Sequence, residues 1–84
     1  MQTVYVLKSL KDNNLYIGCT SNLEKRIQEH NNRRVFSTKK RLPLVLIYSE
    51  NYNDKYEAYR MEGFYKTAKG KRALKNKMQQ CGIV

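Results

Sequence analysis

The sequence predicts an α+β fold: a small three-stranded antiparallel sheet, made of an N-terminal hairpin and a central strand, flanked by about three helices. Residues 3–10 and 15–18 are rich in strand formers, and turn residues (Lys11-Asp12-Asn13-Asn14) separate them. The later run Leu44-Val45-Leu46-Ile47-Tyr48 is apolar throughout, which is typical of a strand covered on both faces. We therefore predict that this run forms the central strand, and that the chain leaves the sheet from Glu50 to Asn53. Three other segments have helical spacing, and two of them begin with capping residues.

Length and charge restrict the class of protein. The 84 residues form one domain, residues 1–84, and 17 Lys and Arg against 7 Asp and Glu give a net charge of +10. Such an excess favours a polyanion partner, with nucleic acid first. A membrane partner is disfavoured, because the chain has no long apolar run and no basic stripe opposite bulky apolar residues. Two cysteines and one histidine provide neither a disulfide framework nor a zinc site, so we expect a cytoplasmic protein with reduced thiols.

The hairpin carries two tyrosines of interest. A four-residue turn would place Leu10 opposite Leu15, and strand alternation would then place Tyr5 and Tyr16 on the same face of the sheet. Gly18 follows Tyr16 and would let a backbone or a ligand approach closely. Ordinary packing is the alternative role for both tyrosines.

A first helix is predicted to begin just after Ser21, because Ser21 and Glu24 have the spacing of a capping box. Leu23, Ile27 and His30 then lie on one stripe, and Arg26 lies beside His30. A cation and an imidazole next to a buried edge suggest a phosphate site. The alternatives are a solvated charge at Arg26 and a helix-dipole contact at His30.

A basic loop follows this helix and ends at Pro43. It is long enough to be functional, and its side chains are suited to phosphate contacts, although a merely solvated loop fits equally well. Its basic residues are Arg33, Arg34, Lys39, Lys40 and Arg41.

The second helix is predicted to begin after Asp54, with Ala58, Met61 and Tyr65 on its apolar stripe. Glu62 lies next to that stripe, where a carboxylate must be ion-paired, hydrogen-bonded or metal-bound. A salt bridge to Arg26 or Lys66 and a metal ion remain alternatives at this point.

A short third helix is predicted after Gly70, packed through Leu74 and Met78. The segment from residue 66 to residue 77 has no acidic residue and offers a second basic surface for nucleic-acid backbone. The candidate contacts in it are Lys66, Lys69, Lys71 and Arg72.

The ordered set of these residues resembles the GIY-YIG nuclease superfamily. The two short tyrosine motifs of that family correspond to Val4-Tyr5-Val6 and Tyr16-Ile17-Gly18, and the remaining family positions correspond to Arg26, His30 and Glu62. The resemblance covers nearly the whole chain and is greatest to small stand-alone members and to the N-terminal nuclease domain of excinuclease C. The first motif departs from the family pattern by lacking glycine and isoleucine. Cys19 stands where excinuclease-type members often have lysine.

The resemblance implies a metal-dependent DNA endonuclease of low sequence specificity, with DNA repair or recombination as its setting. Glu62 would hold one Mg²⁺ or Mn²⁺ ion, Arg26 would bind phosphate, and His30 would assist one of Tyr5 or Tyr16 in activating water. That tyrosine needs a lowered pKa, which Arg26 and the metal would favour. No haem or nucleotide cofactor is expected, and the sequence is compatible with a separate targeting partner without indicating one. The alternatives are a catalytically weak DNA- or RNA-binding module and an RNA-associated protein whose tyrosines stack on bases.

Overall fold

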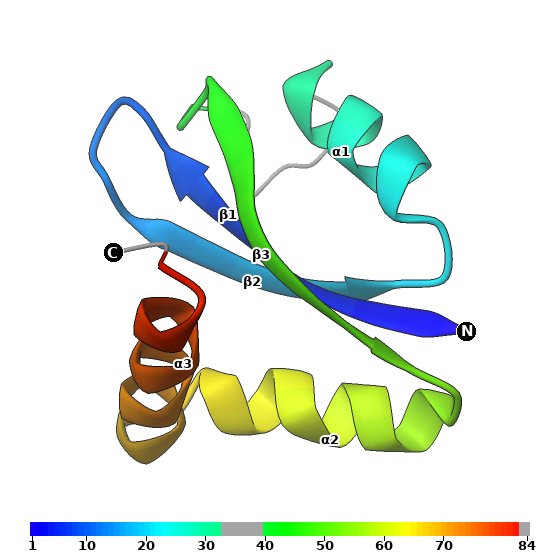
Figure 1. The fold of residues 1–84 in the computed structure, drawn as a ribbon. Coiled ribbons are helices and arrows are strands. Elements are labelled where there is room, and N and C mark those ends of the chain that lie inside the picture. Colours follow the sequence, from blue (N-terminus) through cyan, green and yellow to red (C-terminus); the bar gives the residue numbers. More distant parts are fainter. Residues whose placement is uncertain (33–39, 83–84) are drawn as a thin grey trace.

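A sheet lies between helices on both of its faces (Figure 1). The computed structural model describes residues 1–32 and 40–82. Helix α1 covers one face of the sheet, and α2 and α3 cover the other, which confirms the predicted α+β class. Within the described residues, no helix is long and apolar enough to cross a membrane. The elements in chain order are β1 (Gln2–Ser9), β2 (Leu15–Thr20), α1 (Leu23–Asn31), β3 (Leu44–Tyr52), α2 (Lys55–Tyr65) and α3 (Ala68–Gln80).

Strand β1 is central, because the antiparallel sheet has the order β2-β1-β3. The prediction that residues 44–48 form the central strand is therefore wrong: β3 is an edge strand, with Val45 and Leu46 39% and 41% exposed. A register shift between Val6 and Leu7 of β1 explains part of the apolar run. Because of it, two consecutive residues of β3, Ile47 and Tyr48, both pack against the core on the α2–α3 face.

The hairpin register places Leu7 opposite Tyr16 and Tyr5 opposite Gly18. The turn is longer than predicted, because β1 ends at Ser9 and Asn13 adopts the left-handed conformation with φ 63°. The register differs from the predicted one by two residues. An even shift preserves the alternation of faces, so Tyr5 and Tyr16 do share a face of the sheet.

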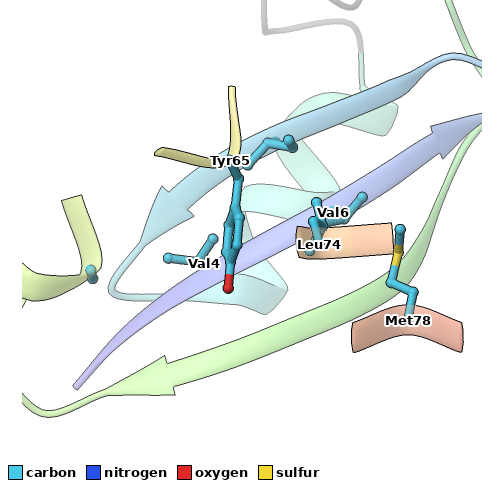
Figure 2. Close-up of a cluster of buried hydrophobic side chains, with 7 residues drawn as sticks. Val4, Val6, Tyr65, Leu74 and Met78 are labelled. Atoms are coloured by element: carbon cyan, nitrogen blue, oxygen red, sulfur yellow. The ribbon is translucent and has the colours of Figure 1, made fainter. Parts of the chain in front are cut away.

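Each face of the sheet has its own core. On the α2–α3 face, the buried residues are Val4, Val6, Ile17, Ala58, Tyr65, Leu74 and Met78 (Figure 2). On the α1 face, the core consists of Tyr5, Leu7 and Leu44, with Tyr16, Leu23, Ile27 and Leu42 packed against it. The apolar stripes predicted for the three helices are therefore the faces that pack on the sheet.

The helix starts differ from the predictions in two of three cases. Helix α1 is capped by Asn22, whose Oδ1 accepts a hydrogen bond from the Lys25 backbone N–H at 3.1 Å, so the Ser21 capping box is wrong. Asp54 caps α2 as predicted and accepts from the Tyr56 N–H at 2.9 Å.

Helix α3 begins before Gly70 rather than after it, and Thr67 is its N-cap. Only glycine fits at position 70 of this helix, because a Cβ there would overlap the backbone carbonyl of Phe64 in α2. Helices α2 and α3 therefore approach each other closely at this glycine.

Candidate active site at the edge of the sheet

Tyr5 is the buried centre of the candidate site. It is 1% exposed and lies on β1 directly opposite Gly18 of β2. A Cβ at Gly18 would overlap the Tyr5 hydroxyl and ring carbons, so the close approach predicted at this glycine is made by Tyr5 itself. Gly18 thereby determines where the Tyr5 hydroxyl lies.

Helix α1 brings two further predicted residues to this hydroxyl. The Tyr5 Oη lies 3.2 Å from Nε2 of the buried His30, and Arg26 Nε donates to the same Oη at 3.4 Å. The Tyr16 ring packs edge-on against the His30 ring, with their centroids 5.2 Å apart. Four of the predicted site residues, Tyr5, Tyr16, Arg26 and His30, therefore form one connected group.

Burial controls the charge state of this cluster. It raises the pKa of Tyr5, and the hydrogen bond and positive charge of Arg26 only partly offset that effect. The Arg26 effect has the direction expected from the sequence, but the net shift is opposite to the lowered pKa that a general base requires. Burial, together with Arg26, also lowers the pKa of His30. Near neutral pH both groups are therefore neutral, and Tyr5 can accept from Arg26 while donating to His30.

Glu62 comes from the helix that covers the opposite face of the sheet from α1. It lies on α2, and its negative charge raises the pKa of both Tyr5 and Cys19, although burial is the larger cause at each. Helix α2 packs against both β1 and β2, the strands that carry Tyr5 and Cys19. Glu62 pairs with Lys66 at 3.0 Å, whereas Arg26 pairs with Glu29 at 3.8 Å.

Glu62 fits a magnesium-type ion only as a single protein carboxylate. The described part of the chain has no group of three or more His, Cys, Asp and Glu side chains that could hold a metal. Mg²⁺ commonly keeps several waters and binds through one or two carboxylates plus substrate phosphates. The partly exposed Glu62 is compatible with that kind of binding and not with an all-protein cage.

The basic residues divide into two groups. Lys40, Lys66, Lys69 and Arg72 are exposed, while Arg41 and Lys71, also exposed, line a separate groove beside α3. Arg33, Arg34 and Lys39 lie outside the described residues.

A polar cluster centred on Glu50 is not evident from sequence reasoning. Its carboxylate accepts hydrogen bonds from Tyr48 (2.6 Å), Tyr52 (2.7 Å), Tyr65 (2.7 Å) and Lys77 (3.1 Å). Burial opposes ionisation, but these hydrogen bonds outweigh it and lower the pKa of Glu50 to about 2. The sequence signal for it is the alternation of side chains in Tyr48-Ser49-Glu50-Asn51-Tyr52, which is typical of a strand. Strand β3 continues to Tyr52, so the prediction that the chain leaves the sheet from Glu50 is wrong.

The family model described as the GIY-YIG catalytic domain matches residues 1–79. This chain belongs to the GIY-YIG family. A UPF0213 protein of Staphylococcus haemolyticus is 45% identical over 73 residues, which are 86% of this chain and 88% of the relative. The UPF0213 protein YazA of Bacillus subtilis is 41% identical over 63 residues, covering 74% of this chain and 63% of that protein. The solution NMR structure of a UPF0213 protein from Bacillus halodurans has a TM-score of 0.55 and 30% identity, covering 90% of this chain and 84% of that one.

As a GIY-YIG domain, the chain has a nuclease-type fold, and nucleic acid is the general class of substrate that this fold implies. The family as a whole is associated with a divalent metal ion. The predicted resemblance is thereby confirmed at the level of the family.

Proposed function

We propose that this protein is a metal-dependent endonuclease that hydrolyses DNA phosphodiester bonds with low sequence specificity. The observation that supports this most is the cluster of Tyr5, Tyr16, Arg26 and His30 in one contact group on a GIY-YIG domain. A module that only binds DNA does not require a buried tyrosine that is hydrogen-bonded to both a cation and an imidazole.

Arg26 is the phosphate-binding group in this proposal. Its Nε is directed at Tyr5, and its side chain is 36% exposed, so the guanidinium can present its remaining N–H donors to a phosphate. A lysine would supply the charge but not the fork of donors. Arg26 thus connects the buried hydroxyl of Tyr5 to the substrate.

The tyrosines and His30 handle the proton in this proposal. His30 is neutral near pH 7 and can exchange a proton with the Tyr5 hydroxyl at 3.2 Å. Tyr16 packs against the same imidazole and is more exposed than Tyr5. Single Tyr5→Phe and Tyr16→Phe variants identify the hydroxyl that orients the attacking water, because only that one abolishes cleavage while DNA binding persists.

Glu62 is the proposed ligand for one Mg²⁺ or Mn²⁺ ion. Such an ion supplies Lewis-acid stabilisation of the phosphoryl oxygens and of the leaving oxygen. Lys66 must then release the Glu62 carboxylate, which is inexpensive for a partly exposed ion pair. Released Lys66 is well placed to contact a substrate phosphate.

DNA backbone contacts are assigned to basic residues of the predicted loop and of the segment from residue 66 to residue 72. Because they contact phosphates rather than base edges, low sequence specificity follows. A role in DNA repair or recombination, a cytoplasmic location and a separate targeting partner complete the proposal. The assigned residues are Arg33, Arg34, Lys39, Lys40, Lys66, Lys69 and Arg72, with Arg41 and Lys71 at the boundary of the neighbouring groove.

The test is incubation of the purified protein with duplex, nicked, branched and damaged DNA, with and without Mg²⁺ or Mn²⁺. We expect metal-dependent strand cleavage that Arg26→Ala removes. Absence of cleavage on every substrate, with DNA binding intact, would overturn the nuclease proposal.

One observation favours a catalytically weak DNA- or RNA-binding module instead: the Glu62 carboxylate is already paired with Lys66 at 3.0 Å. Glu62→Gln separates the two functions. If the protein is a nuclease, Glu62→Gln should abolish metal-dependent cleavage, because several kcal/mol of transition-state stabilisation by the metal are lost. The variant should bind DNA as well as the parent or better, because a negative charge near the phosphates is removed. For a binding module with a structural ion pair, it should lower the melting temperature and change nothing else.

A further inference from the structure

An open groove lies beside α3, on the face of the sheet opposite α1. It has a volume of about 900 Å³, and its lining includes neither Tyr5, Arg26 nor His30, so it is separate from the candidate active site. Its size is at the upper end of the range of small-ligand sites, roughly 300–1,000 Å³. The groove is therefore large enough to take several side chains of a partner.

The rim of this groove is cationic. Lys8 comes from β1, Arg41 from the segment before β3, and Lys71 and Lys75 from successive turns of α3. No acidic residue is among the described residues that line the groove. The rim therefore attracts a negatively charged ligand.

The floor of the groove is aliphatic. Leu15 is 38% exposed, and Ile17 and Ile47 lie beside it on the sheet. Leu74 and Met78 of α3 lie beneath this surface, packed against the sheet and only 1% and 2% exposed, so Leu15 and Ile47 supply most of the accessible apolar surface (Figure 2). An accessible aliphatic surface of this kind is suited to leucine-type side chains of a partner.

These features restrict the occupant. A single nucleic-acid strand is bound by stacking its bases on aromatic rings, and no aromatic residue is among the described residues that line the groove. Duplex DNA would offer phosphates to the rim but no apolar side chains to the aliphatic floor. A second copy of this chain carries the same charge of +10 and would be repelled by the rim. An acidic amphipathic helix matches both the aliphatic floor and the cationic rim. Its apolar stripe would cover the floor, and its carboxylates would pair with the lysines and the arginine of the rim.

We propose that this groove, which we call the α3 groove, docks an acidic amphipathic helix of a partner protein. The α3 groove and the cluster around Tyr5 lie on opposite faces of the sheet, so both can be occupied at once when Arg41 and Lys71 contact the docked helix rather than DNA. Docking would place the domain on a larger assembly while leaving Arg26 accessible. This inference does not depend on whether the protein cleaves DNA.

The test is an NMR titration of the ¹⁵N-labelled full chain with a synthetic helical peptide that has leucines on one face and glutamates beside them. A peptide of the same composition in scrambled order is the control. We expect saturable shifts of the amide signals of Leu15, Ile17, Ile47, Lys71 and Met78, with the α1 signals unchanged. A duplex DNA oligonucleotide is titrated in parallel as a competing ligand.

Two variants and two matched controls sharpen this titration. Leu15→Ser removes apolar area from the floor, and Lys75→Glu reverses a charge of the rim. Each substitution should lower the affinity for the helical peptide about ten-fold. Leu10→Ser, at a 56% exposed leucine outside the groove, and Lys55→Glu, at an exposed lysine of α2, should leave affinity unchanged. The proposal is overturned if the helical peptide shows no saturable binding, if the scrambled peptide binds equally well, or if DNA saturates the same signals at lower concentration.

Discussion

Contacts of single side chains assemble the candidate site, and the Tyr5 hydroxyl is where they meet. It lies over Gly18, accepts from Arg26 and contacts His30 at 3.2 Å. None of these groups is unusual alone. Their combination places a buried phenol, a neutral imidazole and a partly exposed guanidinium within one hydrogen-bonded chain, which is the arrangement that phosphodiester hydrolysis can use.

Gly18→Ala should displace Tyr5. The new Cβ would overlap the Tyr5 hydroxyl, so we expect a loss of about 1–3 kcal/mol in the free energy of unfolding, measured by denaturant titration. The contact between Tyr5 and His30 should be lost with it. Gly63→Ala is the matched control, because nothing lies within 4 Å of that position in α2, and alanine there should stabilise the protein by about 0.5–1 kcal/mol. Equal effects of the two substitutions would contradict the role of Gly18.

Arg26→Lys should reduce cleavage far more than binding. Lysine keeps the charge but loses the hydrogen bond from Nε to Tyr5 and the fork of donors. We expect turnover to fall roughly 100-fold or more, with DNA affinity within a few-fold of the parent. Arg60→Lys, at an exposed arginine of α2, should change neither quantity. If Arg26→Lys cleaves like the parent, Arg26 is an ordinary surface charge.

At the level of helices and strands, the Glu50 cluster joins β3 to both α2 and α3. Tyr65 comes from α2 and Lys77 from α3, and both reach the same carboxylate on the edge strand. Because the side chain of Glu50 is only 16% exposed, removing its charge weakens the shared acceptor of three tyrosine hydroxyls and of the Lys77 ammonium in a partly buried site. The cluster is thus a polar connection among three elements that otherwise pack through apolar side chains.

The Glu50 cluster predicts acid sensitivity. The folded state lowers the pKa of Glu50 from 4.5 to about 2, so its contribution is fully present above pH 4.5 and is lost as the pH falls toward 2. We expect about 2–3 kcal/mol of the free energy of unfolding to disappear over that interval. Glu50→Gln should lose this amount at neutral pH and flatten the acid side of the stability profile.

Tyr52→Phe provides a milder test, because it removes one of the hydrogen bonds and should cost about 1–2 kcal/mol. Glu57→Gln, at an exposed position of α2, is the control and should stay within about 0.5 kcal/mol of the parent. An unchanged acid profile in Glu50→Gln would show that other groups govern the acid transition.

Local signals predicted the elements well. Asp54 caps α2, and Leu23, Ile27 and His30 share one face of α1, because capping and helical periodicity depend on neighbours in sequence. The shared face of Tyr5 and Tyr16 was predicted from an incorrect register, and it survived only because the shift was even.

Contacts between residues far apart in the sequence could not be predicted from capping and periodicity. The apolar run of β3 suggested a central strand, yet which strand pairs on both sides depends on the whole sheet. Glu50 was missed for the same reason, since its partners Tyr65 and Lys77 are 15 and 27 residues away. In the site, strand periodicity predicted that Tyr5 and Tyr16 share a face, and the family resemblance joined them to the helix. The pairing of Glu62 with Lys66 was one of several alternatives.

Across the whole molecule, the net charge of +10 implies a strong dependence of DNA binding on salt. The logarithm of affinity should fall linearly with the logarithm of salt concentration, by about 0.9 per neutralised phosphate on duplex DNA. Replacing Lys66, Lys69 and Arg72 together by alanine should reduce that slope by roughly 2–3 and weaken unrelated sequences alike. The charge-preserving triple variant Lys66→Arg, Lys69→Arg and Arg72→Lys should keep the parent slope. Fluorescence anisotropy at several salt concentrations measures both. Strong discrimination among unrelated duplexes at one salt concentration would show that base edges, and not only phosphates, are being read.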